Sequence, residues 1–189
     1  EPYAISKIAG IKLCESYNRQ FSSKFKVDYR SIMSCNLFGP NDNYNLQNSH
    51  VVPALIRRFY EAKKNKKKYI KLWGTGKAKR ELLYVDDMAE ACVFLMNLSK
   101  NKYLKHILPM QSHLNVGSGY DISIEDLATK ISKVIGYEGG IKFDKNKPDG
   151  APRKLMNSSK INQLGWKSKT SLNKGLKTTY KDFLINKKK

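Results

Sequence analysis

The sequence predicts an α/β fold, in which a sheet of short strands is covered by helices. Segments with apolar residues at helical spacing alternate with short β-rich segments along the whole chain, and turn residues separate them. The chain also has 189 residues with 40% hydrophobic content, which is enough to bury a sizeable core. Strands that alternate with helices indicate an α/β sheet domain.

The first elements are predicted to be a helix followed by a strand. Apolar residues recur at helical spacing over residues 2–22: Ile8, Ile11, Cys14 and Tyr17. Residues 27–40 are rich in strand formers and end in a Gly-Pro turn. This strand is expected to bring Asn36 and Gly39 to its C-terminal end.

The middle of the chain continues the alternation. Residues 41–49 have loop composition, and residues 50–66 predict a helix with Val52, Leu55, Ile56 and Phe59 on one face. Residues 69–85 predict two extended pieces around a Gly-x-Gly turn. Asp86 is expected to cap the helix that follows it.

The last third predicts strand, helix, strand and helix. Residues 113–119 predict a short strand, and Ser123 is expected to cap a helix over residues 124–137. That helix has an apolar face of Leu127, Ile131 and Val134. Residues 141–150 predict a strand and a turn. The final helix, over residues 171–189, is expected to face inward with Leu172, Leu176, Tyr180 and Phe183.

The charge of the chain is unusually positive. Its 36 Lys and Arg residues against 16 Asp and Glu residues give a net charge of +20. Such a charge attracts phosphate-rich partners, including nucleic acid. However, the densest runs, residues 63–71 and the terminal lysines, are nearly all lysine and have little of the interleaved Arg and aromatic residues of a base-reading surface. We therefore predict a solvated lysine-rich surface, with no nucleic-acid partner.

Membrane and cysteine patterns indicate an intracellular protein. No stretch of 18 apolar residues is present, and the first residues lack the pattern of a secretory signal. The three cysteines, Cys14, Cys35 and Cys92, are scattered among apolar neighbours without CxxC spacing. We expect buried free thiols, no metal site, no membrane association and a cytoplasmic location.

Tyr3 and Lys7 are the first candidate catalytic pair. Residues four apart on a helix lie on one face, so the phenol and the ammonium address the same small volume. A phenol can donate a proton to the oxygen of a ketone that is being reduced, and a nearby ammonium stabilises the phenolate that remains. An ordinary exposed Tyr and Lys would have the same spacing.

One expected feature of a nucleotide-binding sheet is absent from the chain. Such a sheet normally opens with a strand, a Gly-rich turn and a helix whose N-terminus meets the phosphates. The two Gly-x-Gly sequences here, at residues 74–76 and 117–119, lack the third glycine, and we predict that both are turns.

Five segments carry a resemblance to a known family. Residues 3–21, 36–62, 72–91, 114–128 and 147–166 together resemble the C-terminal part of the GDP-L-fucose synthases, within the extended short-chain dehydrogenase/reductase family. The segments NSHVVPALIRRF and KPDGAPRKL are specific to this group, whereas Tyr-x-x-x-Lys alone indicates only the wider family. The resemblance implies a Rossmann-like NAD(P)-binding fold with a smaller α/β substrate-binding domain.

The resemblance also implies a division of the chain. Residues 1–40 would be the C-terminal part of the Rossmann-like domain. Residues 41–189 would be mainly the substrate-binding domain, with about residues 86–118 returning to the Rossmann-like sheet. The family's Gly-rich turn, catalytic serine and catalytic cysteine would precede the first residue given, so we expect the chain to begin mid-protein.

The implied reaction converts GDP-4-keto-6-deoxy-D-mannose to GDP-L-fucose, by 3,5-epimerisation and NADPH-dependent reduction of the 4-keto group. Tyr3 would be the proton donor and Lys7 its partner, and His50 would be an acid/base for epimerisation, a task that suits imidazole near neutral pH. The cofactor would contact Tyr3, Lys7, His50 and the segment Ser34, Cys35, Asn36 and Leu37. The GDP-sugar would contact Arg58, Trp73, Arg80, Asp149 and Lys154.

The resemblance implies a homodimer for the complete protein, while the isolated 189 residues are expected to be inactive and prone to associate. His50 could instead be a helix-capping or core-edge histidine, and the substrate-site residues could be surface packing. The alternative function is a non-catalytic basic module that binds a GDP-sugar or a polyanion, which steeply salt-dependent binding would support in its polyanion form.

Overall fold

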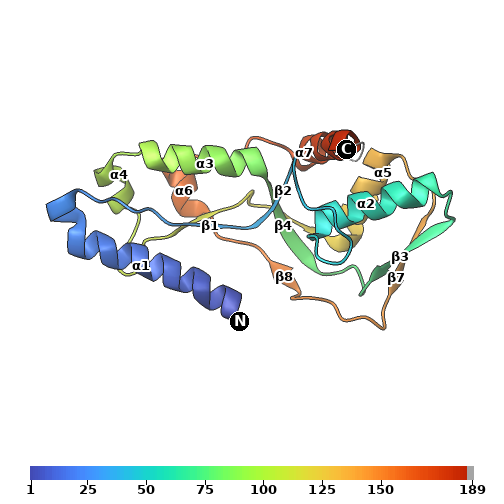
Figure 1. The fold of residues 1–189 in the computed structure, drawn as a ribbon, viewed down its shortest axis with the longest axis horizontal. Helices are drawn as coiled ribbons and strands as arrows, with labels where there is room; N and C mark the ends of the chain where they lie inside the picture. The colour runs from blue at the N-terminus through green and yellow to red at the C-terminus, as the bar shows by residue number, and fades with distance from the viewer. Residues whose placement is uncertain (187–189) are drawn as a thin grey trace.

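The computed structural model describes residues 1–186, and its helices and strands form an elongated α/β molecule (Figure 1). At one end, β1 (Ile32–Ser34) pairs in parallel with β5 (Leu114–Val116). Four helices surround this pair: α1 (Pro2–Phe25), α3 (Val85–Asn97), α4 (Lys100–Leu104) and α6 (Ser159–Leu164).

At the other end, β3 (Tyr69–Trp73) pairs in parallel with β7 (Gly140–Asp144). The helices of this end are α2 (Val51–Lys64), α5 (Ile124–Ile135) and α7 (Leu172–Asn186). Residues 187–189, the terminal lysines of the predicted last helix, lie outside the described residues.

A third sheet lies between the two ends and connects them. β4 (Lys79–Tyr84) is its central strand, with β2 (Asn36–Phe38) parallel on one side. β6 (Asp121–Ser123) runs antiparallel to the start of β4. β8 (Arg153–Lys154) also pairs with the start of β4, in parallel. Since β1 ends at Ser34 and β2 begins at Asn36, one short connection passes from the first sheet to the central one.

The main core forms where α2, α5 and α7 pack on the sheets. The predicted inward faces are confirmed, because Val52, Leu55, Ile56, Phe59, Leu127, Ile131, Leu176 and Phe183 are all buried. Val134, Leu172 and Tyr180 pack against the same cluster from its edge. Each fully buried large apolar side chain contributes on the order of 1.5–3 kcal/mol, so this cluster is the principal source of stability.

Two predicted helix caps had different outcomes. Ser123 caps α5, since its Oγ accepts a hydrogen bond from the Asp126 amide at 3.0 Å. The prediction for Asp86 was wrong: Tyr84 is the N-cap of α3, and Asp86 lies in the first turn. The helix begins earlier than expected because it follows β4 without a loop. In the first turn, the Asp86 carboxylate still interacts favourably with the positive end of the helix dipole.

The prediction of buried thiols was also wrong, although all three cysteines are free. Cys92 is exposed, and Cys14 and Cys35 are only half-buried. Cys92 belongs to α3, which also exposes Val93 and Met96. Cys14 lies on α1, a helix in which Glu15 is the one buried residue. Apolar neighbours in the sequence therefore did not indicate burial.

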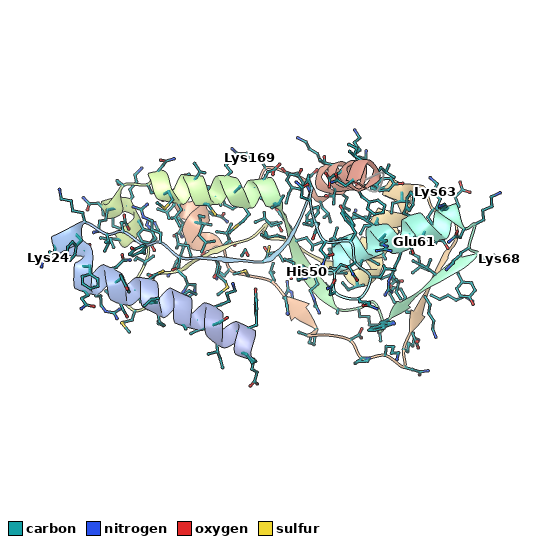
Figure 2. The ribbon with its side chains drawn as sticks, in the orientation of Figure 1. Lys24, His50, Glu61, Lys63, Lys68 and Lys169 are labelled. Atoms are coloured by element: carbon teal, nitrogen blue, oxygen red, sulfur yellow. The ribbon has the colours of Figure 1, made fainter. Side chains whose placement is uncertain are left out.

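The lysine run after α2 follows its predicted solvated character, since residues 63–69 are exposed. Lys68 lies at the far end of the molecule in Figure 2, whereas the Lys63 ammonium donates to the Ile135 carbonyl at 2.7 Å. Among residues 1–186, no helix is both long enough and apolar enough to cross a membrane.

Candidate functional site

An open depression of about 600 Å³ lies where the first and central sheets meet, and the N-terminal ends of α1 and α2 contribute to it. Its lining residues come from four separate segments: Tyr3; Ser34, Cys35, Asn36 and Leu37; His50; and Lys154 and Met156. Seven of these eight residues were predicted as site residues from the sequence. Met156 was not.

The first wall is the start of α1. Pro2 opens the helix, a position that suits proline because no intrahelical partner is needed for its missing N–H. The Tyr3 side chain is 76% exposed, and the Nζ of Lys7 lies 5.2 Å from the centre of its ring. The predicted pairing of phenol and ammonium on one helix face is therefore present in the structure.

The second wall is the connection between β1 and β2. The Cys35 amide donates to the carbonyl of Val116 at 3.3 Å, and the Asn36 side-chain amide donates to the Glu81 carbonyl at 3.2 Å. Burial, together with the negative charge of Glu81, raises the pKa of the Cys35 thiol to about 12. Cys35 therefore stays protonated at neutral pH and is a lining residue without the character of a nucleophile.

The third wall is His50, at the N-cap position of α2 (Figure 2). Its carbonyl accepts the first helical hydrogen bond, from the Ala54 amide at 3.0 Å, but its ring forms no capping bond. The imidazole is exposed and available for proton transfer. Burial raises the pKa of the nearby Asp42 carboxyl, while the Asn43 amide and His50 act in the opposite direction. Asp42 is therefore a carboxylate neighbour of His50 that the sequence analysis missed.

The fourth wall follows β8. Arg80 and Lys154 are register partners in the pairing of β4 with β8, which brings Lys154 to the depression. Two residues later, the Met156 amide donates to the Glu81 carboxylate at 2.9 Å. The depression thus combines a phenol, an imidazole and an ammonium from three elements, a set that can exchange protons with a bound carbonyl compound.

The other predicted substrate residues do not line this depression. Three of them gather around the turn between β3 and β4: Trp73 is 67% exposed with the Lys147 ammonium 5.6 Å from its ring, and the Arg80 guanidinium donates to the Ala151 carbonyl at 2.6 Å. Asp149 accepts from the Thr75 amide and hydroxyl at 2.9 and 2.6 Å. Arg58 is half-buried on α2.

Asp149 accepts its hydrogen bonds from the turn between β3 and β4. The hydrogen bonds from Thr75, first that from its hydroxyl and then that from its amide, hold the pKa of the Asp149 carboxyl below its ordinary value. Gly74 and Gly76, with φ of 78° and 79°, form the predicted Gly-x-Gly turn that presents Thr75. Asp149 therefore joins two loops, and its contact with a substrate stays a prediction.

The first part of the chain matches a known protein family. The NAD dependent epimerase/dehydratase family matches residues 1–117, which include Tyr3, Lys7, the connection between β1 and β2, and His50. The chain belongs to this NAD-dependent epimerase/dehydratase family.

Curated relatives support the predicted resemblance. The chain is 53% identical over 186 residues to the GDP-L-fucose synthase of Escherichia coli, covering 98% of this chain and 57% of that protein. It is 50% identical over 186 residues to GDP-L-fucose synthase 1 of Arabidopsis thaliana, covering 98% of this chain and 54% of that protein. The chain thus spans about half the length of these relatives.

Solved structures confirm the fold class. A GDP-6-OMe-4-keto-L-xylo-heptose reductase from C. jejuni has a TM-score of 0.84 and 31% identity, covering 95% of this chain and 59% of that one. A GDP-L-fucose synthetase from Naegleria fowleri, bound to NADP, has a TM-score of 0.80 and 27% identity, covering 93% of this chain and 53% of that one. The predicted α/β, Rossmann-like class of this epimerase/dehydratase family member is therefore confirmed.

Among residues 1–186 of this family member, no group of three or more His, Cys, Asp or Glu side chains could hold a metal ion. The sequence analysis missed Met156, Asp42 and Glu81. Only Glu81 left a signal, because a carboxylate immediately before the apolar run LLYV is unusual for a residue in a predicted strand.

Proposed function

We propose that the native protein converts GDP-4-keto-6-deoxy-D-mannose to GDP-L-fucose, by epimerisation at C3 and C5 and NADPH-dependent reduction at C4. The observation that carries the proposal is the depression itself, where a phenol, an imidazole and an ammonium from separate elements line one space. The curated relatives named GDP-L-fucose synthase support the same reaction.

In the reduction, Tyr3 donates its hydroxyl proton to the C4 oxygen as negative charge develops there. The Lys7 ammonium on the same face stabilises the phenolate left behind. NADPH, when bound, supplies the hydride that C4 receives. The residues present fit this cofactor, since the polar Ser34 and Asn36 and the apolar Leu37 form one continuous wall beside Tyr3. The NADP-bound Naegleria fowleri structure supports the choice of cofactor.

In the epimerisation, a proton next to the C4 carbonyl leaves on one face of the sugar and another returns on the opposite face. His50 serves as one of the acid/base groups, because its ring makes no capping bond and lies in the same depression as Tyr3. Both reactions can then use one bound sugar without its release.

Binding of a GDP-sugar requires cations for its diphosphate and a flat surface on which its base can stack. Lys154 offers an ammonium inside the depression. Arg58, Arg80 and Trp73 offer two guanidinium groups and an exposed indole outside it, and Asp149 orders the loop beside Arg80. We assign these residues to GDP-sugar binding, with Asp149 in a supporting role.

We further propose that the native protein is a cytoplasmic homodimer. Ile5, Ile8 and Leu13 leave an apolar face of α1 exposed, which a second copy could cover. The three free thiols are typical of a reducing compartment. Sedimentation of the native protein at the mass of a single protomer would contradict the dimer.

The test is the dependence of NADPH oxidation on the sugar nucleotide. The native protein should oxidise NADPH only when GDP-4-keto-6-deoxy-D-mannose is present, and GDP-L-fucose should accumulate in equal amount. Binding of GDP without turnover would contradict the enzyme and favour the non-catalytic module. Steep loss of that binding with added salt would indicate its polyanion form.

A further inference from the structure

Glu81 is a buried carboxylate that the proposed reaction does not use. It lies within β4, its residue is 0% exposed, and no Lys or Arg within residues 1–186 forms an ion pair with it. Burying an unpaired carboxylate is costly unless hydrogen bonds satisfy its oxygens. A carboxylate buried at the centre of the sheet therefore needs hydrogen-bond donors for its oxygens.

Those partners are backbone amides from two separate loops. Oε1 accepts from the Gly119 amide at 2.8 Å, and Oε2 accepts from the Met156 amide at 2.9 Å. Gly119 follows β5, whereas Met156 follows β8. One side chain of the central strand therefore joins two loops that are 37 positions apart in the sequence (156 − 119).

A glycine makes room for this arrangement. A Cβ added at Gly117 would lie 2.2 Å from Oε1 and 2.7 Å from Cδ of Glu81, far inside van der Waals contact. Because Glu81 is 0% exposed and bonded to two amides, its carboxylate could make room for such a Cβ only by shifting away from those amides. The absence of a side chain at position 117 and the carboxylate at position 81 therefore belong to one packed unit.

This unit borders the candidate site on two sides. Met156 lines the depression, and Lys154 lies two residues before it on the same wall. On the opposite side, the Glu81 carbonyl accepts from the side chain of Asn36, another lining residue. The rise in the pKa of the Cys35 thiol that Glu81 causes, in addition to burial, is consistent with this closeness.

We propose that Glu81 is a positioning residue, whose buried carboxylate fixes the segment 154–156 so that the Lys154 ammonium is held in the depression. Glu81 itself does not contact the substrate. The inference rests on the proposed function, because it assigns Lys154 to the bound GDP-sugar. It predicts an effect on substrate binding that is transmitted through Lys154.

The experiment compares Glu81→Gln, Lys154→Ala and the double variant in the native protein. Gln has only one acceptor oxygen, so whichever way its amide lies, its NH2 group faces one of the two backbone amides and the link between the loop after β5 and the 154–156 segment is broken. Glu81→Gln should raise KM for the sugar nucleotide about tenfold and change kcat less than about threefold, as expected when ground-state binding is lost. The double variant should have the KM of Lys154→Ala alone, because the two residues act through one interaction.

A second variant and a control make the result decisive. Gly117→Ala displaces the carboxylate without changing its charge, and it should raise KM in the same way if Glu81→Gln fails to fold. The matched control is Asp87→Asn, because Asp87 is also buried and accepts from the Thr170 amide, at 2.9 Å, but lies outside the depression. It should lower thermal stability and leave KM unchanged.

Three outcomes would overturn the inference while the wild-type protein is active. These are an unchanged KM in Glu81→Gln and Gly117→Ala, a KM in the double variant equal to the product of the two separate effects, or an equal rise in KM in Asp87→Asn. A wild-type protein that never turns over the sugar nucleotide would instead refute the proposed function. Faster hydrogen exchange at the Met156 amide in Glu81→Gln would still reveal whether the carboxylate fixes this segment.

Discussion

Helices α1 and α2 each carry a candidate proton-transfer residue near the N-terminal end, Tyr3 on α1 and His50 at the cap of α2, but they are held by different forces. α2 has 14 residues and buries six of them, including Phe59 and Ile56. α1 has 24 residues and buries only Glu15. The sheets therefore hold one helix by its apolar face, whereas the other lies on the surface of the molecule (Figure 1).

Polar contacts fasten α1 instead. The Lys12 ammonium donates to the Met110 carbonyl at 2.6 Å, and the Glu15 carboxylate accepts from the Ser112 amide at 2.9 Å. Both partners lie in the loop before β5. The two sides of the candidate site therefore differ in kind: His50 is positioned by the core, and Tyr3 by the hydrogen bonds of its helix to the loop before β5, to the Tyr29 backbone and to the Lys100 side chain.

The largest expected effect comes from the core of α2. Phe59 is 0% exposed, and its ring packs against that of Tyr137 at 5.5 Å between centres. Phe59→Ala should lower the free energy of unfolding by about 3–5 kcal/mol, since it removes a large side chain and leaves a cavity. Denaturant unfolding measures this loss. A loss below about 1 kcal/mol would contradict the claim that apolar packing holds α2.

An intermediate effect concerns the docking of α1 and depends on pH. Burial would raise the pKa of Glu15, but hydrogen bonds from Lys12 and Ser112 outweigh burial and lower it below its ordinary value of 4.5. Because the folded-state pKa is the lower one, the carboxylate stabilises the docked helix above about pH 4.5. That contribution is lost as the pH falls through the folded-state pKa.

Hydrogen exchange at the Ser112 amide, corrected for its intrinsic pH dependence, measures this loss. Protection should fall as the pH is lowered below about 4.5 in the wild-type protein, and Glu15→Gln should remove the pH-dependent step. A step of the same size in Glu15→Gln would show that another group controls the docking of α1.

The smallest expected effect is that of a surface ion pair on α2. The Arg57 guanidinium and the Glu61 carboxylate lie 2.8 Å apart, four residues from each other on the helix, and both are partly exposed (Figure 2 labels Glu61). Glu61→Gln should cost only about 0.3–0.5 kcal/mol in denaturant unfolding, because solvent screens such pairs. A cost comparable to that of Phe59→Ala would show that charges, too, hold α2.

The same contrast explains which predictions from the sequence succeeded. Periodicity correctly predicted the buried faces of α2, α5 and α7, because these helices pack on sheets within the chain. The same pattern over residues 2–22 predicted the helix but not its exposure, since periodicity does not reveal what a helix packs against. Ile8, an apolar member of that pattern, is 54% exposed.

For the candidate site, short-range spacing and the family resemblance predicted Tyr3, Lys7, His50 and the segment 34–37. The role of Glu81 could not be predicted, because its partners Gly119 and Met156 come together only through the pairing of β4, β6 and β8. A polar bond between loops that are distant in the sequence leaves no periodic signal.

The measurement that tests the central claim most directly follows both reactions in the Tyr3→Phe variant of the native protein. NADPH oxidation and deuterium incorporation from D2O at C3 and C5 of the sugar are recorded together. We predict that NADPH oxidation falls by at least about 100-fold, as expected on loss of a general acid, while deuterium incorporation persists in part. Oxidation of NADPH at the wild-type rate would contradict the assignment of Tyr3, and with it the account of this depression as the site of reduction.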